Sequence, residues 1–266
     1  MSSPAGASIS HPIITINLFY NMSDKNLVSR LFEAGSHFGF KKARRHPTMA
    51  SYLYTTKEGS DVIDLAKTGE SLVAAKAVLL EAGKLGKTVM FVGTKDEASK
   101  IVKAAAEKAE APYVTNRWIG GMMTNFTEIK KRINRLETLT NEKTTGELDR
   151  KYTKKERVVI GREAAKLEFN FFGISKLTKL PDMLLVVDPR HDHIAVTEAA
   201  EKNIPVMALT STDGDTRLIK YPVVANDALQ TSISLIVTEL VDAYIEGKSA
   251  YVPAEKSATP TRRRTA

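Results

Sequence analysis

Apolar and polar positions alternate in blocks along most of the chain, in an order that predicts strands and helices in turn. Short apolar runs predict strands at 88–92, 111–115, 183–187, 206–209 and 221–224. Longer stretches with apolar residues at helical spacing predict helices at 68–85, 95–109, 193–202 and 227–245. This alternation predicts an α/β fold with a parallel sheet flanked by helices, in a flavodoxin-like three-layer architecture.

The pattern before residue 68 is less regular. A short helix is expected from about residue 26 to Gly35, on the apolar stripe Leu27, Val28, Leu31 and Phe32. The segment HFGFKKARRHP that follows is polar and basic. Two short strands, 52–54 and 62–65, are expected around a turn at Glu58 and Gly59.

Residues 125–179 interrupt the alternation and contain no strand signal. Apolar residues recur first at Phe126, Ile129, Ile133, Leu136 and Leu139. After the polar stretch NEKTTGELDR they recur at Ile160, Ala164, Leu167, Phe171 and Ile174, with heptad spacing. Two narrow apolar stripes joined by a short connector predict a protruding antiparallel coiled-coil αα-hairpin, inserted into a discontinuous α/β domain of residues 22–124 and 180–247.

The two ends of the chain differ from the rest. Residues 1–21 carry an apolar stretch broken by Thr15 and Asn17 with no preceding Lys or Arg, which is not a signal peptide. We interpret them as a disordered extension, with Met22 resembling a fresh start. Residues 248–266 are expected to form a disordered basic tail with Arg262, Arg263 and Arg264. No run is long and apolar enough to predict a membrane span.

The composition of the chain indicates a polyanionic binding partner. The chain has 266 residues, of which 42% are hydrophobic, so it can bury a sizeable core. Its net charge of +8 is typical of proteins that bind nucleic acid. The chain has no cysteine, which excludes disulfides and cysteine-ligated zinc.

The positive charge is concentrated in a few places. Residues 125–179 contain 14 Lys and Arg against 8 Asp and Glu. The candidate phosphate-binding residues are Lys41, Lys42, Arg44 and Arg45 in the basic segment, Arg117, and Lys130, Lys131, Arg132, Arg135, Lys151, Lys154 and Lys155 in the insert. Any one of them is ordinary surface charge, but together they favour binding along a phosphate backbone.

Three loops after predicted strands resemble enzyme sites, and for each we favour a structural interpretation. VGTKDEA has one glycine rather than a phosphate-binding fingerprint, so a tight turn with a solvated Lys95 is expected. DPRHDHIA places Asp188 near His191 and His193, but no third metal ligand is evident. Asp192 is expected to cap the following helix. TSTDGDTR, residues 210–217, is expected to be a plain connection.

The stretch NRWIGGMMTNF holds the only tryptophan and predicts a joint between sheet and hairpin. Gly120 and Gly121 permit a close turn or a left-handed conformation. Trp118 is expected to pack its ring against the domain while its N–H keeps a polar partner. Thr124 or Asn125 is expected to cap the first helix of the hairpin.

The same stretch resembles a known signature. RWIGGMMTN is similar to RWLGGMLTN of the family of the second protein of the bacterial small ribosomal subunit. GSHFGFKKARRHPTM resembles that family's HFGH segment, with Phe40 in place of its second histidine. VMFVGTKDEA, the TKKE at 153–156 and LPDMLLVVDPRHDHIAVTEAAEKNIPV also match family segments. The resemblance extends from about Met22 to Gly247.

The resemblance implies a structural constituent of the small ribosomal subunit, cytoplasmic in location, which is not an enzyme. Its implied partners are 16S rRNA and neighbouring small-subunit proteins, including the large mRNA-binding one. It implies no cofactor, no metal, no membrane and no small-molecule substrate. Two alternatives stay open from the residues alone: an α/β enzyme for a phosphorylated small molecule, and a scaffold outside the ribosome.

Overall fold

A five-stranded parallel sheet forms the centre of the protein, whose computed structural model describes residues 23–251. The strands lie in the order β5-β4-β6-β7-β8. Their bounds are Val89–Val92 for β4, Tyr113–Val114 for β5, Met183–Val187 for β6, Val206–Thr210 for β7 and Tyr221–Val224 for β8. The parallel sheet predicted from the alternating pattern is confirmed.

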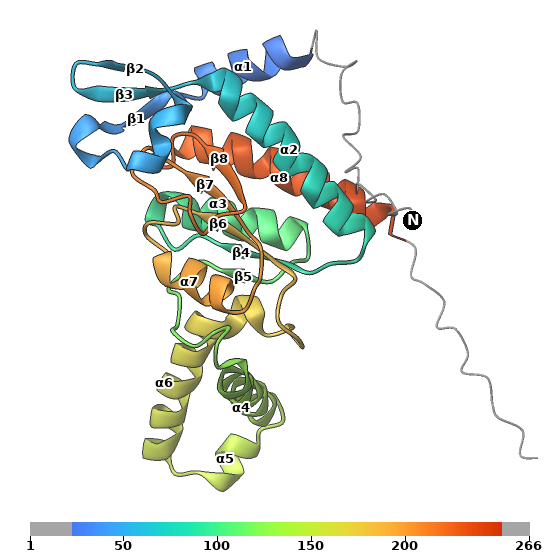
Figure 1. Ribbon diagram of the computed structural model, residues 1–266. Helices are drawn as coiled ribbons and strands as arrows, with labels where there is room; N and C mark the ends of the chain where they lie inside the picture. The colour runs from blue at the N-terminus through green and yellow to red at the C-terminus, as the bar shows by residue number, and fades with distance from the viewer. Residues whose placement is uncertain (1–22, 252–266) are drawn as a thin grey trace, which may run out of the picture.

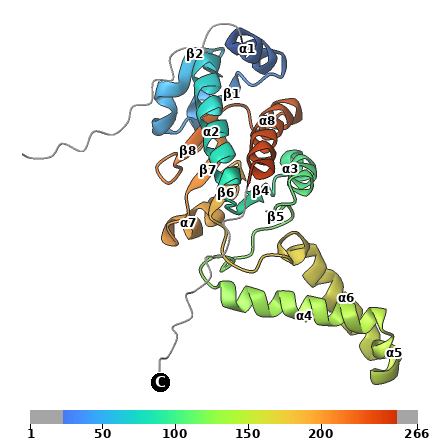
Figure 2. The same ribbon diagram turned by 90° about the vertical axis from the view of Figure 1, so that its right-hand side faces the viewer.

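Helices cover both faces of this sheet, as Figures 1 and 2 show. They are α2 (Leu65–Lys84), α3 (Asp96–Lys108), α7 (His193–Glu201) and α8 (Gln230–Ser249). Successive strand residues enter opposite cores because side chains alternate across a strand. Phe91 and Leu185 pack with α2, α3 and α8, whereas Met90 and Leu184 pack with α7. The result is a three-layer arrangement.

A small antiparallel sheet precedes the central one. It has the order β1-β3-β2, with β1 at Phe38–Lys41, β2 at Leu53–Lys57 and β3 at Ser60–Ile63. The helix α1 (Ser23–Glu33) and two 3-10 turns, Lys42–Arg44 and Pro47–Tyr52, complete this N-terminal module. Glu58 and Gly59 have positive φ angles of 52° and 76°, which confirms the predicted turn.

The strand β1 was not expected within the basic segment. Its four residues, FGFK, are too few to indicate a strand by themselves and none of them is fully buried, so the strand depends on its pairing with β3. A contact with a distant loop also holds it, since the N–H of Phe40 donates to Thr212 Oγ1 at 2.9 Å. Tertiary pairing of this kind overrides a weak local signal.

Three helices lie between β5 and β6: α4 (Phe126–Thr144), α5 (Glu147–Lys151) and α6 (Lys154–Phe171), followed by a 3-10 turn at Phe172–Ile174. Both views show them extending away from the sheet, and we call residues 126–171 the arm. The predicted polar connector contains the short helix α5. Thr153 and Glu156 start α6 with a reciprocal capping box.

The two long helices of the arm bury their stripes unequally. Ile129, Ile133, Leu136 and Leu139 of α4 are buried, as their spacing predicts. In α6 the one buried residue is Phe171, while Ile160, Ala164 and Leu167 are half-buried. Figure 1 shows α4 nearly end-on and α6 lengthwise, so the helices cross at an angle. The small residues Gly161 and Ala164 also weaken the apolar stripe of α6. Regular coiled-coil packing of the two helices therefore stays a prediction.

A buried carboxylate on α7 binds the joint that precedes the arm. Glu198 of α7 accepts hydrogen bonds from Trp118 Nε1 at 3.2 Å and from the N–H groups of Gly121, Met123 and Thr124 at 2.7, 2.9 and 3.2 Å. The Thr124 hydroxyl donates to it as well, at 3.2 Å. Burial would raise the pKa of Glu198, but these donors outweigh burial and lower it.

The joint shows the expected indole contact and glycine conformation but not the expected helix cap. The polar partner of the Trp118 N–H is confirmed, and Gly121 has the left-handed φ of 88° that a glycine permits. The predicted helix cap is wrong. Asn125 occupies the N-cap position without a side-chain bond, and Glu198 takes the Thr124 hydroxyl.

We expect Glu198→Gln to lower the free energy of unfolding by about 3 kcal/mol, because an amide accepts through one oxygen and faces the remaining donors with its own N–H groups. Urea unfolding, monitored by the fluorescence of Trp118, measures this change, and the indole that reports it contacts Glu198 directly. Glu201→Gln, at an exposed position of the same helix, is the control and should change stability by less than about 0.5 kcal/mol. Equal effects at both positions would contradict the role of Glu198.

Two glycines set the distance between α2 and α8. A Cβ on Gly83 would lie 2.6 Å from the carbonyl oxygen of Tyr244, and a Cβ on Gly247 would overlap the carbonyl oxygen of Leu80. Backbone atoms cannot move aside as a flexible side chain can. We therefore expect Gly247→Ala to destabilise the protein by about 2 kcal/mol.

Gly161→Ala is the matched comparison for Gly247→Ala. Its Cβ would point into open space within α6, so it should raise the free energy of unfolding by about 0.5–1 kcal/mol. Equilibrium urea unfolding of both variants gives the two signs. The same sign for both would refute the close contact between α2 and α8.

Candidate nucleic-acid interface

The basic residues of the N-terminal module do not all face solvent. Lys41 and Lys42 are exposed. Arg45 is instead paired with the fully buried Asp61, with 2.7 Å between Arg45 Nε and Asp61 Oδ2. The hydrogen bond from Arg45 is the main cause that lowers the pKa of Asp61. Arg45 therefore serves mainly to neutralise a buried carboxylate.

Arg44 belongs to a bridge between three loops. Its Nη2 lies 3.1 Å from Asp213 Oδ2, and Arg190 Nη1 donates to the same oxygen at 2.6 Å. The guanidinium of Arg44 also lies 4.4 Å from the centre of the Phe40 ring. Both arginines remain about half exposed, at 53% and 52%. Sequence reasoning missed Arg190, because nothing in DPRHDHIA indicates that its loop meets Asp213.

The arm presents a second group of cations. Lys130, Arg132, Lys154 and Lys155 are exposed, as is Arg117 at the joint. The other three candidates pair with carboxylates on the arm: Lys131 with Glu128, Arg135 with Glu163, and Lys151 with Glu147. These pairs are exposed, and such pairs stabilise weakly, so a phosphate can compete for the cations.

The structure separates the two groups. The N-terminal module lies at one end of the molecule and the arm at the other, with the central sheet between them (Figures 1 and 2). The tail arginines, Arg262 to Arg264, lie outside the described residues, as do residues 1–21. The candidate cations thus form two regions rather than one continuous face.

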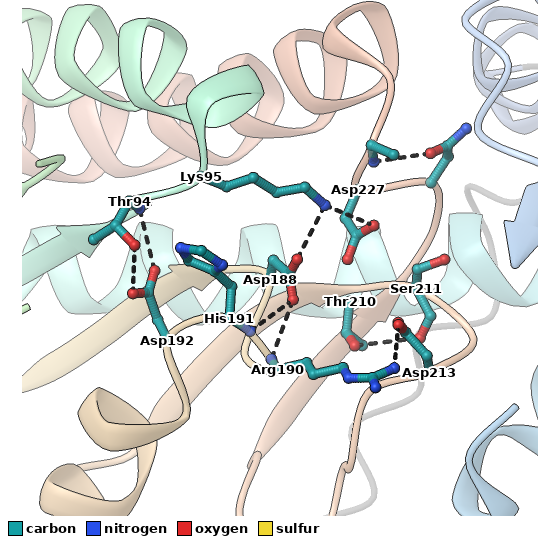
Figure 3. A network of polar contacts seen from close by, with 12 residues as sticks. Thr94, Lys95, Asp188, Arg190, His191, Asp192, Thr210, Ser211, Asp213 and Asp227 are labelled. Carbon is teal, nitrogen blue, oxygen red and sulfur yellow. Dashed lines mark hydrogen bonds and ion pairs between the residues drawn. The ribbon is translucent and has the colours of Figure 1, made fainter. Parts of the chain in front are cut away.

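A cluster of carboxylates lies where the parallel strands end (Figure 3). Lys95 Nζ is 3.0 Å from Asp188 Oδ2 and 3.5 Å from Asp227 Oδ1. Lys95 is therefore paired in a partly buried site, and the prediction that it is solvated is wrong. Burial raises the pKa of Asp227 to about 7; repulsion from Asp188 adds to the shift, and attraction by Lys95 opposes it.

The other acids of this cluster bind backbone or hydroxyl groups. Asp188 accepts from the N–H groups of Arg190 and His191 at 3.2 and 3.0 Å. The helix α7 begins at His193 as expected, but the predicted cap is wrong, since Asp192 accepts from the N–H and the hydroxyl of Thr94 at 3.1 and 2.7 Å. Within residues 23–251 no group of three or more histidines and acids is arranged to hold a metal.

The loop after β7 supports the N-terminal module. Ser211, Thr212 and Asp213 are buried in it. Thr212 accepts the N–H of Phe40 through its hydroxyl and the N–H of His46 through its carbonyl oxygen, both at 2.9 Å. The predicted plain connection is thus a structural support, because the side chains of Thr212 and Asp213 bind Phe40, Arg44 and Arg190.

Residues 31–247 match the model of the family described as Ribosomal protein S2. The chain belongs to this family. "Small ribosomal subunit protein uS2" of Dictyoglomus thermophilum is 42% identical over 222 residues, covering 84% of this chain and 90% of the relative. The protein of the same name from Flavobacterium psychrophilum is 39% identical over 240 residues, covering 90% of each. That from Fusobacterium nucleatum is 41% identical over 220 residues, covering 83% and 89%.

Membership of this family fits the state of the carboxylates at the strand ends, which are bound by other groups of the protein. The ribosomal protein S2 family is a family of structural components of the ribosome rather than of enzymes. In keeping with this role, Lys95, Thr94 and backbone N–H groups bind the carboxylates that an enzyme would keep for its substrate. No described helix is both long enough and apolar enough to cross a membrane.

The raised pKa of Asp227 gives a pH dependence with a definite sign. Between pH 3.8 and about pH 7, the carboxyl of Asp227 is protonated in the folded chain but ionised in the unfolded chain. The contribution of Asp227 to stability is therefore fully present below pH 3.8 and is lost as the pH rises to about 7. We expect Asp227→Asn to lose less stability than the wild type between about pH 5 and pH 8.

Urea unfolding at the two pH values measures this difference. Asp242→Asn is the control, because Asp242 is about half exposed and pairs with Lys108 on the surface. It should keep the pH dependence of the wild type. An unchanged pH dependence in Asp227→Asn would show that the cluster does not hold this proton.

Proposed function

We propose that the chain is a structural constituent of the small ribosomal subunit in the cytoplasm, that it binds 16S rRNA, and that it helps dock the large mRNA-binding ribosomal protein during translation. The observation that carries the RNA-binding part is the set of exposed cations on the arm and its joint: Arg117, Lys130, Arg132, Lys154 and Lys155. The name shared by the relatives supports the place in the small subunit.

The arm suits contact with a phosphate backbone. Its cations come from two helices and the joint, so they can reach several phosphates at once. Each phosphate contact releases condensed counterions, which makes binding salt-dependent. Lys131, Arg135 and Lys151 join these contacts by exchanging carboxylate partners for phosphate. We propose that residues 125–179 act as an inserted RNA-binding hairpin and that residues 22–124 and 180–247 hold it.

The N-terminal module forms a second contact region. Lys41, Lys42 and Arg44 supply its exposed charge. Arg45 contributes charge to the same region, while its main partner is Asp61. Because the sheet separates this region from the arm, the two regions contact different parts of the rRNA or of its neighbouring proteins.

The test replaces the four arm cations together, as Lys130→Gln, Arg132→Gln, Lys154→Gln and Lys155→Gln. We expect weaker binding to 16S rRNA. The slope of log affinity against log salt should fall by just under 1 for each phosphate that the variant no longer binds. Filter binding across a potassium chloride series measures both quantities, and co-sedimentation with small subunits that lack the protein checks incorporation.

The control removes the same charge elsewhere, at four exposed lysines: Lys84→Gln, Lys87→Gln, Lys100→Gln and Lys202→Gln. It corrects for the loss of general attraction and should leave the slope nearly unchanged. Equal slopes for the two variants would show that the arm makes no direct phosphate contacts. Arg45 is kept in both variants, because its removal would leave Asp61 buried without a cation.

A further inference from the structure

Two exposed aromatic rings border one cavity at the base of the arm. Phe169, in the last turn of α6, is 61% exposed, and Phe172, in the following 3-10 turn, is 56% exposed. Both line a cavity of about 340 Å³ between the end of α6 and the end of β5. Single exposed phenylalanines are common on protein surfaces, but two beside the same cavity form a local apolar site.

The fold holds these rings in place. Phe171, between them in sequence, is buried with Ile174 in the core beneath the sheet. Gly173 lies directly against the backbone and ring of Tyr113, and a Cβ there would lie 2.7 Å from the ring. Because Phe171 and Gly173 are fixed, Phe169 and Phe172 face outward on a rigid support.

The walls of the cavity are polar. Thr115, Asn116 and Asn170 line it together with the two rings. The Asn116 side chain donates through Nδ2 to the carbonyl oxygen of Phe169, so its position is set. The amide still has an acceptor oxygen and a second hydrogen to offer. A flat ligand with hydrogen-bonding edges matches this combination.

The charges near the cavity distinguish a base from a phosphate. Glu168 lines the cavity, and α6 ends there with the partial negative charge of its last carbonyl groups. Both features repel an anion inside the cavity. Lys103 also lines the cavity, but it pairs with Glu107 at 4.0 Å. The exposed Arg117 directly follows Asn116, so a cation is available for a phosphate beside the cavity. A neutral base attached to a charged backbone satisfies both conditions.

We propose that this cavity receives one unstacked nucleobase of the small-subunit rRNA, stacked on Phe169 or Phe172 with its edge bound by Asn116. The inference rests on the proposed rRNA binding and extends it from the backbone to a base. Single-stranded or bulged RNA offers such a base, and stacking on an aromatic ring tolerates any of the four.

The experiment measures the affinity of the full chain for 16S rRNA at several salt concentrations, for Phe169→Leu, Phe172→Leu, Phe169→Tyr and Phe172→Tyr. At least one leucine variant should bind about 5- to 100-fold more weakly, which corresponds to the loss of one stacked base. Its salt slope should stay that of the wild type, because every phosphate is still bound. The tyrosine at the same position should keep the affinity within about twofold, because it preserves an aromatic ring.

Val158→Ala is the control for an exposed apolar side chain of α6 outside the cavity, and it should bind as the wild type does. Wild-type affinity in both leucine variants overturns the inference. So does normal rRNA affinity combined with poor entry into subunits, which would assign the cavity to a protein neighbour. The proposed function fails separately, if the wild-type chain shows no salt-dependent rRNA binding or if the arm and control charge variants have equal slopes.

Discussion

The arrangement of sheet and arm depends on the hydrogen bonds that the buried carboxylate of Glu198 accepts. Five donors from residues 118–124 converge on its two oxygens. Burying a negative charge is unfavourable unless donors of this kind surround it. The joint is therefore specified by chemistry as well as by shape, since an apolar residue at 198 would leave the turn without this acceptor. These hydrogen bonds help to set the position of the arm, and therefore the position of every surface that the arm presents.

The carboxylates at the strand ends illustrate a different use of charge. Parallel strands end together at one edge, and enzymes of this fold class bind substrates there. In this chain the same edge is used to attach the N-terminal module. Thr212 binds β1, and Asp213 binds Arg44 of that module together with Arg190. Lys95 lies between two aspartates of the edge itself. A site of this fold class thus becomes an internal support, which leaves the exposed cations outside the sheet for recognition.

The sequence predicted most of the central domain because its signals are local. The apolar runs at β6 and β8 gave the observed bounds, and alternate strand residues entered two cores as their period requires. What sequence reasoning missed depends on contacts between distant segments. β1 exists through pairing with β3 and a bond to Thr212. The expected caps at Asp192 and Thr124 failed because Thr94 and Glu198, which lie 98 and 74 positions away in sequence, bind those side chains instead. Similarly, the exposure of Lys95 could not be predicted without knowing that Asp188 and Asp227 converge on it.

The place of the arm in the chain has a consequence for the sheet itself. The arm takes the position of the crossover helix that ordinarily connects two parallel strands, here β5 and β6. Ile129, Ile133 and Phe171 at its base, with Ile174 and Leu177 just after it in the chain, share one buried core with Met90, Leu184 and Val186 of the sheet. The proximal part of the arm therefore helps to close the core on this side of the sheet, whereas the distal part, from Leu136 outward, lies outside that core. A change in the length of the distal part would leave this core covered, whereas losing the proximal turns would expose one face of it to water.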